Sequence, residues 1–114
     1  ITEFIIDTSK YNMEKGNLSD IQISTKQEAV NAFVKVLNNT SNKTMKEITM
    51  LNAAGGLLVA GICNKFDEGV ELALETINNG NAFKKLKQFA KENNSLEKLE
   101  DLEWYGKHFR KTCQ

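Results

Sequence analysis

The sequence predicts a mostly α-helical segment with one or two short strands near its N-terminal end. Three observations predict this class. Apolar residues recur at helical spacing from Val30 onward. Two stretches, Thr25-Lys-Gln-Glu28 and Thr44-Met-Lys-Glu47, match the capping box that starts a helix. β-branched and aromatic residues are concentrated in residues 2–7. We therefore expect one strand, with room for a second, and about five helices.

The strands are expected first along the chain. Residues 2–7 form the clearer candidate, because Phe4 and Ile6 would share one face of a strand. Residues 8–24 show no clear period and are predicted to be a surface connection with a turn near Asn12. Within it, Ile21 and Ile23 alternate with polar neighbours, which allows a second, very short strand.

The first two helices are predicted from their capping boxes. One begins at Thr25 and is broken at Asn38-Asn39. The other is capped by Thr44 and contains the most apolar stretch, Met50–Cys63, in which only Asn52 is plainly polar. This stretch is too short to span a bilayer, so we expect a helix that is buried on nearly all sides.

Burial of this apolar helix has two further consequences. Each helical glycine costs about 1 kcal/mol relative to alanine, so Gly55 and Gly56 should be compensated by the close approach of another backbone. The amide of Asn52 should be hydrogen-bonded to a neighbouring loop or strand, because an unpaired buried amide is costly.

Three shorter helices are predicted in the second half of the chain. Asn64 is the expected cap of the first, which carries Asp67 and Glu68 in its first turn and ends at Asn79-Gly80. The second starts at Asn81, and Asn94-Ser95 separates it from the third. Their apolar positions are Phe66, Val70, Ala73, Leu74 and Ile77, then Phe83, Leu86 and Phe89, then Leu96, Leu99 and Leu102.

Composition excludes several functional classes. Lysine plus arginine number 15 and aspartate plus glutamate number 15, which argues against a nucleic-acid partner and gives no reason to expect an anionic membrane. The two cysteines form no CxxC motif and no signal peptide is evident, so we expect a cytoplasmic location. A chain without proline that begins at Ile1 is expected to be a piece of a longer protein.

Candidate chemical groups are few. His108 has no serine or cysteine placed to partner it, and we interpret it as a surface histidine. The stretch from Gly56 to Gly61 has the glycine spacing of a phosphate loop but lacks the Lys-Ser/Thr that follows one, so helix packing is the better interpretation. Asp67-Glu68 could hold magnesium, but acids are expected in the first turn of a helix anyway. Residues 84–87 carry three lysines that are typical of a solvated face.

The apolar block Leu51-Asn-Ala-Ala-Gly-Gly-Leu-Leu-Val-Ala-Gly61 is followed by Phe66-Asp-Glu-Gly-Val-Glu-Leu-Ala73 and by Ile77-Asn-Asn-Gly-Asn-Ala82. In order and spacing these blocks resemble the C-terminal end of anthranilate phosphoribosyltransferase. Upstream, Ile1–Asp7 resembles a late strand of that family. Asn12 stands where the family usually has glycine, and asparagine tolerates the left-handed conformation well.

The resemblance implies a fold and a division of the chain. Residues 1–90 would be the C-terminal part of an α/β, nucleoside phosphorylase/phosphoribosyltransferase-like catalytic domain. Residues 91–114 match nothing in the family and would be a helical extension or linker.

The resemblance also implies an activity. Such an enzyme transfers phosphoribosyl from phosphoribosyl pyrophosphate to anthranilate, with magnesium, in tryptophan biosynthesis, and the parent would be a cytoplasmic homodimer. The glycine loop and the Asp-Glu magnesium site of the family precede the matched region, so no catalytic, substrate-binding or metal-binding residue is assigned in this chain. The implied role is a scaffold, and the 114 residues alone should be loosely packed and inactive.

Two other interpretations remain open. The chain could be a free-standing helical interaction module that binds through Trp104, Tyr105 and Phe109. It could also be a fragment of a nucleoside phosphorylase-like enzyme, although the Leu51-Asn-Ala-Ala54 block favours the transferase.

Overall fold

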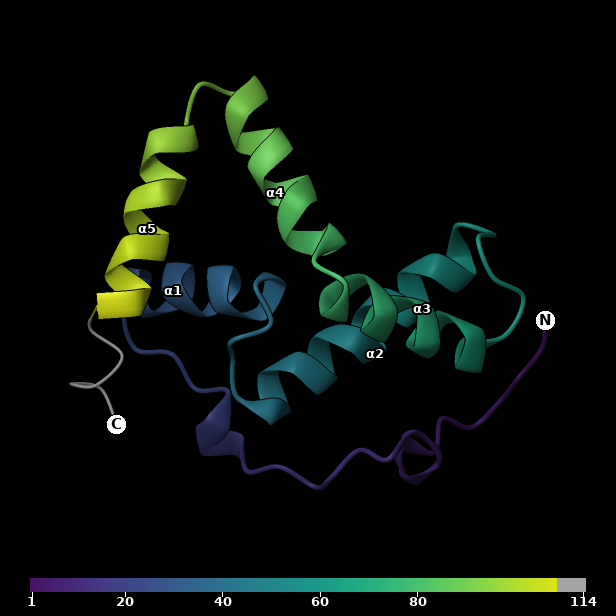
Figure 1. The fold of residues 1–114 in the computed structure, drawn as a ribbon. Helices are drawn as coiled ribbons and strands as arrows, with labels where there is room; N and C mark the ends of the chain where they lie inside the picture. Colours follow the sequence, from purple (N-terminus) through teal and green to yellow (C-terminus); the bar gives the residue numbers. More distant parts are fainter. Residues whose placement is uncertain (109–114) are drawn as a thin grey trace.

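The structure is a computed structural model that describes the backbone of residues 1–108 and the side chains of residues 1–102. Two short 3-10 helices and five α-helices follow one another along this part of the chain (Figure 1). The predicted number of helices is therefore confirmed. The elements are η1 (Thr8–Tyr11), η2 (Leu18–Asp20), α1 (Lys26–Leu37), α2 (Lys43–Val59), α3 (Phe66–Asn78), α4 (Asn81–Glu92) and α5 (Leu96–His108).

The predicted strands are absent from the described residues 1–108. Residues 2–7 form no regular structure, and so do residues 22–24 beside Ile21. A strand needs a neighbouring strand to pair its backbone N–H and C=O groups, and this part of the chain provides none. Ile5, at 91% exposed, lies open on the surface instead. The prediction of one or two short strands was therefore wrong for this chain by itself.

The helix starts were predicted to within a few residues. Thr25 caps α1: its Oγ1 accepts a hydrogen bond from the Glu28 amide at 3.1 Å. For α2 the predicted cap was wrong. Asn42 caps this helix by accepting from the Met45 amide at 2.8 Å, and Thr44 lies inside the first turn. Lys65, without a side-chain hydrogen bond, stands at the start of α3 in place of the predicted Asn64.

Asparagine and glycine form the corners between helices. Asn39, Asn94 and Gly80 have φ angles of 59°, 56° and 84°, in the left-handed region where these two residue types are the least strained. They end α1, α4 and α3 at the predicted breaks. Asn12 is also left-handed, at φ 56°, as its place in the sequence predicted.

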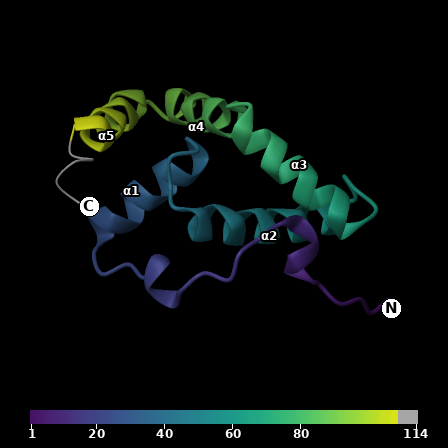
Figure 2. The same cartoon turned by 60° about the horizontal axis from the view of Figure 1, so that its bottom comes forward.

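Two apolar clusters hold the helices together. The larger joins α2 to α3, and the smaller joins α1, α4 and α5. Figure 2 shows α3, α4 and α5 following one another along one side of the molecule, with α1 and α2 facing them. The buried members are Met50, Ala54, Phe66, Val70, Ala73 and Ile77 in the larger cluster, and Val34, Phe83, Ala90 and Leu99 in the smaller.

The apolar helix α2 is buried on one side only, contrary to the prediction. Its buried residues are Met50 and Ala54, whereas Val59 is 90% exposed. A Cβ placed on Gly55 or Gly56 would meet no atom within 4 Å in the part of the chain that the structure describes, so no described backbone approaches there. The close approach lies instead at Gly69 of α3, where a Cβ would stand 3.0 Å from the backbone of Ala54. Among the described residues, α3, part of α1 and the N-terminal segment around Gly16 cover α2, which leaves the side that carries Asn52 and Gly56 open.

Asn52 also differs from the prediction. Its side chain is exposed, and its Nδ2 donates to the carbonyl oxygen of Ile48 at 2.8 Å, within the same helix. No loop or strand of the described residues accepts this amide, because the open side of α2 is the side on which Asn52 lies.

Candidate functional site

The acidic pair in the first turn of α3 has structural partners. Asp67 accepts a hydrogen bond from the Tyr11 hydroxyl at 2.5 Å, and Glu68 accepts one from the backbone N–H of Asn64 at 3.2 Å. Within residues 1–102, whose side chains are described, no three histidine, cysteine or acidic side chains gather as a metal site would require. The pair thus fastens the N-terminal segment and the start of α3.

The other sequence candidates lie apart from one another. Gly56 lies inside α2, and Gly61 follows it with a φ of 75°, so the two glycines form no phosphate-binding loop. The Cys63 thiol is free and buried. On α4, the Lys87 ammonium stands 4.9 Å from the centroid of the Phe83 ring, an arrangement typical of a cation–π contact.

The C-terminal candidates are described in part. The backbone of α5 includes Trp104, Tyr105 and His108, but their side chains lie outside the described residues. Phe109 and Cys113 lie wholly outside them.

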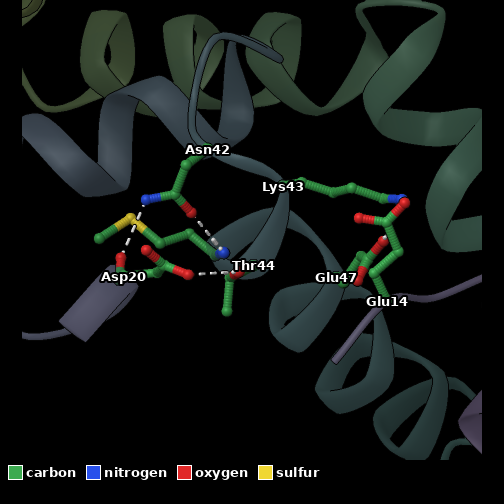
Figure 3. Close-up of polar contacts among 7 residues, drawn as sticks. Glu14, Asp20, Asn42, Lys43, Thr44 and Glu47 are labelled. Carbon is green, nitrogen blue, oxygen red and sulfur yellow. Dashed lines mark hydrogen bonds and ion pairs between the residues drawn. The ribbon is translucent and has the colours of Figure 1, made fainter. Parts of the chain in front are cut away.

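A polar cluster at the start of α2 was missed by sequence reasoning (Figure 3). The Asn42 side chain uses both ends: its oxygen caps α2, and its Nδ2 donates to the Asp20 carbonyl oxygen at 2.9 Å. The Thr44 hydroxyl donates to the Asp20 carboxylate at 3.2 Å. Because these bonds span more than twenty residues of chain, they tie η2 to the first turn of α2. The sequence shows an asparagine, Asn42, just before a helix, which is a signal for a cap. It does not show that the same side chain also binds Asp20.

An ion pair continues this polar cluster on the other side of α2. Lys43 Nζ lies 3.3 Å from the Glu14 carboxylate and 3.5 Å from that of Glu47, one turn further along the helix. The hydrogen bond with Glu14 raises the pKa of the Lys43 amine above its ordinary value, and Glu47 adds to the effect. Gly16 passes close by, and a Cβ at that position would overlap the Thr44 side chain. The N-terminal segment is thus held against α2 at two places.

The Tyr11–Asp67 hydrogen bond has a large effect on the ionisation of Tyr11. It joins residues 56 positions apart and raises the pKa of Tyr11 to about 12 from an ordinary 10.0. The hydrogen bond is the main cause, and burial of the hydroxyl and the charge of the carboxylate add to it. The Tyr11 ring also lies 6.1 Å from that of Phe66, centroid to centroid.

This hydrogen bond predicts a pH dependence of stability. The folded protein keeps the Tyr11 proton up to about pH 12, whereas the unfolded chain releases it near pH 10. The contribution of the Tyr11 hydroxyl to the free energy of unfolding is therefore complete below pH 10 and is lost as the pH rises from 10 to about 12. We expect the free energy of unfolding to fall more steeply over this interval for the unmodified chain than for Tyr11→Phe, in urea titrations at stepped pH. Parallel curves for the two proteins would contradict the assignment.

An apolar groove of about 330 Å³ runs between α1 and α2. Side chains of both helices and of the segment around Ile21 line it, and Phe33 stands at its edge with 58% of its surface exposed. The groove holds no charged side chain. Its lining residues are Ile21, Ile23, Ala29, Ala32, Phe33, Val36, Leu37, Met45, Ile48 and Thr49.

These features position helices rather than assemble reacting groups. In residues 1–102 the hydrogen-bonded carboxylates serve as caps, ties and surface ion pairs. No helix in the described residues combines the length and the hydropathy needed to cross a membrane.

Comparison with known proteins shows the family to which the chain belongs. Residues 1–83 match the family model described as "Glycosyl transferase family, a/b domain". The chain belongs to this glycosyl transferase family. The match covers α1, α2 and α3 and reaches the first turn of α4.

Relatives with curated names show which enzymes of this family the chain is similar to. An anthranilate phosphoribosyltransferase of Nitrosopumilus maritimus (strain SCM1) is 50% identical over 97 residues, which is 85% of this chain and 28% of that enzyme. Enzymes of the same name from Bacillus pumilus (strain SAFR-032) and Priestia megaterium (strain ATCC 12872 / QMB1551) are 37% and 32% identical over 81% and 77% of the chain. The chain covers 28% and 26% of these two enzymes. No solved structure gives a significant match.

The family resemblance expected from the Leu51–Gly61 and Phe66–Ala73 blocks is thereby confirmed. The division of the chain at residue 90 stays a prediction. The structure describes α4 as one helix through Glu92, and α5 packs on α1 and α4.

Proposed function

We propose that this chain is the C-terminal scaffold segment of an anthranilate phosphoribosyltransferase. The enzyme would transfer phosphoribosyl from phosphoribosyl pyrophosphate to anthranilate, for tryptophan biosynthesis. One observation carries the proposal. The three enzymes of that name reported above match 77% to 85% of this chain, whereas the chain covers only 28% of the Nitrosopumilus maritimus enzyme.

The substrates and the chemistry would belong to the remainder of such an enzyme, and the 114 residues alone would be inactive. The described residues do not fit a magnesium site, because Asp67 and Glu68 are engaged by Tyr11 and Asn64 and no third acidic group joins them. Magnesium ligands, if the enzyme follows its family, belong to chain outside these residues. The α/β fold of the whole domain is part of the same proposal.

The part played by this chain would be support. The tightly packed α2–α3 pair, fastened by Tyr11 and by the polar cluster at Asn42, forms a stiff element on which substrate-binding loops can be held in place. We propose a cytoplasmic homodimer with small-molecule substrates and without nucleic-acid or membrane partners. The balance of 15 basic and 15 acidic residues supports the last two points.

The two other interpretations have less support. An interaction module would use Trp104, Tyr105 and Phe109, whose side chains lie outside the described residues. A nucleoside phosphorylase-like origin is disfavoured because the relatives reported above all carry the name anthranilate phosphoribosyltransferase.

A chimeric enzyme tests the proposal. The region of the Nitrosopumilus maritimus enzyme that aligns with this chain is replaced by the corresponding residues of the chain. We expect anthranilate-dependent release of pyrophosphate from the chimera. We expect none from the 114-residue chain or from the relative with that region deleted. A folded but inactive chimera, or turnover by the isolated chain, would contradict the proposed role.

A further inference from the structure

The smaller apolar cluster is completed by residues that follow the family match. That match ends at residue 83, in the first turn of α4. Val34 and Leu37 of α1 and Phe83 of α4 lie inside the match, whereas the other members of the cluster lie beyond it. These other members are Leu86, Ala90, Leu99 and Leu102. The cover of this face of α1 therefore comes largely from the part of the chain after residue 83.

A tight corner returns the chain from α4 to α1. Asn94 has a left-handed φ of 56°, and the backbone N–H of Ser95 donates to the carbonyl oxygen of Ala90 at 2.8 Å. The Ser95 hydroxyl donates to the same oxygen at 3.2 Å. These bonds fix the direction in which α5 leaves the corner. Figure 1 shows α5 running back from the end of α4 to the start of α1.

The two ends of α1 are held in different ways. At its C-terminal end, Asn39 Nδ2 donates to Asn78 Oδ1 of α3 at 3.4 Å. At its N-terminal end the side-chain hydrogen bonds are local, because Thr25 caps the helix and Gln27 Nε2 donates to Asn31 at 3.1 Å. The N-terminal end therefore depends on packing against a neighbouring element.

α5 is the helix that faces this end of α1. The two helices are in contact, and a hollow between them is lined by Gln27, Lys98, Asp101 and Leu102. Toward α2, the same stretch of α1 borders the 330 Å³ groove, so this side is loosely filled. We call α5, Leu96–His108, the C-terminal strap.

We propose that the C-terminal strap holds the first half of α1 in place, and that it can detach while the α2–α3 pair stays folded. Among residues 96–102 of the strap, Leu99 is the one buried side chain, at 5% exposed. The α2–α3 pair has an apolar cluster of its own, to which the strap does not belong. Segments with few buried apolar contacts open locally at a lower free energy than the rest of a protein.

This role goes beyond the proposed function and does not depend on it. The strap is a conformational element that acts on α1, so its effect is on the order of that helix rather than on bound substrates. Its detachment would uncover Val34 and Phe83, which are 7% and 8% exposed when the strap is in place. The residues after 90 thus acquire a part in the fold.

Hydrogen exchange, measured residue by residue in the 114-residue chain with an osmolyte present, tests this inference. Leu99→Ala removes most of the buried side chain of the strap. We expect the amides that are hydrogen-bonded within α1 to exchange faster by at least about tenfold. Those of α3 should change by less than about twofold. Glu100→Ala is the matched control, since Glu100 is the exposed neighbour on the same helix, and it should leave both helices unchanged.

A chain that ends at Asn94 extends the test, because it lacks the strap altogether. We expect α1 to lose its protection in this variant, while α2 and α3 keep theirs. Equal acceleration of α1 and α3 in Leu99→Ala, or loss of protection in α3 on truncation, would overturn the inference by showing one cooperative unit. An α1 that is unaffected by Leu99→Ala, or unprotected in the unmodified chain, would overturn it as well. No substrate enters these measurements, so their failure is distinguishable from a failure of the proposed transferase activity.

Discussion

Replacing Phe66 with alanine is expected to lower the free energy of unfolding by about 3 kcal/mol. Phe66 is the first residue of α3, is 8% exposed, and belongs to the larger apolar cluster. Its ring also lies 6.2 Å from that of Phe4 and 6.1 Å from that of Tyr11, centroid to centroid. The substitution thus leaves a cavity between α2 and α3 and removes two of the ring contacts that hold the N-terminal segment.

Phe89→Ala is the matched control for this experiment. Phe89 is 64% exposed on α4, so its removal should change the free energy of unfolding by less than about 0.5 kcal/mol. Urea titrations of the three proteins, with an osmolyte present to preserve the folded baseline, measure both changes. Equal losses for the two variants would show that the α2–α3 cluster does not hold the chain together.

Replacing Gly69 with valine is expected to destabilise the chain by a similar amount, about 3 kcal/mol. A Cβ at Gly69 would stand 3.0 Å from Cα and O of Ala54, which are backbone atoms that cannot rotate away. The two γ carbons of valine would add to the overlap and push α3 away from α2. Gly69 is therefore the residue that sets how closely these two helices approach.

The control here is Gly55→Ala in the 114-residue chain. Gly55 is also a helical glycine, but no atom of the described residues lies within 4 Å of its Cβ position, so the variant should be more stable by about 1 kcal/mol. Opposite signs for Gly69→Val and Gly55→Ala, measured as unfolding midpoints, are the expected result. A stabilising Gly69→Val would mean that α2 and α3 are not in close contact in solution.

The residues that the sequence identified correctly act locally. Thr25 caps the helix that follows it, and Asn39, Gly80 and Asn94 turn the chain where helices end. Such signals depend on neighbours within four residues, so they can be recognised without knowing the fold. The family itself was also recognisable, because blocks such as Leu51–Gly61 are read directly from the order of residues.

Tertiary structure decided everything that depends on distant partners. The Tyr11–Asp67 hydrogen bond and the Asn42–Asp20 contact connect segments that no periodicity relates. Residues 2–7 have the composition of a strand, yet they remain irregular because pairing requires another strand. Likewise, the apolar sequence of α2 predicts burial, but which side is covered depends on the elements that are present. Among the described residues, α3, part of α1 and the N-terminal segment reach α2. Burial requires two surfaces in contact, so the sequence of one helix cannot show which of its sides is covered.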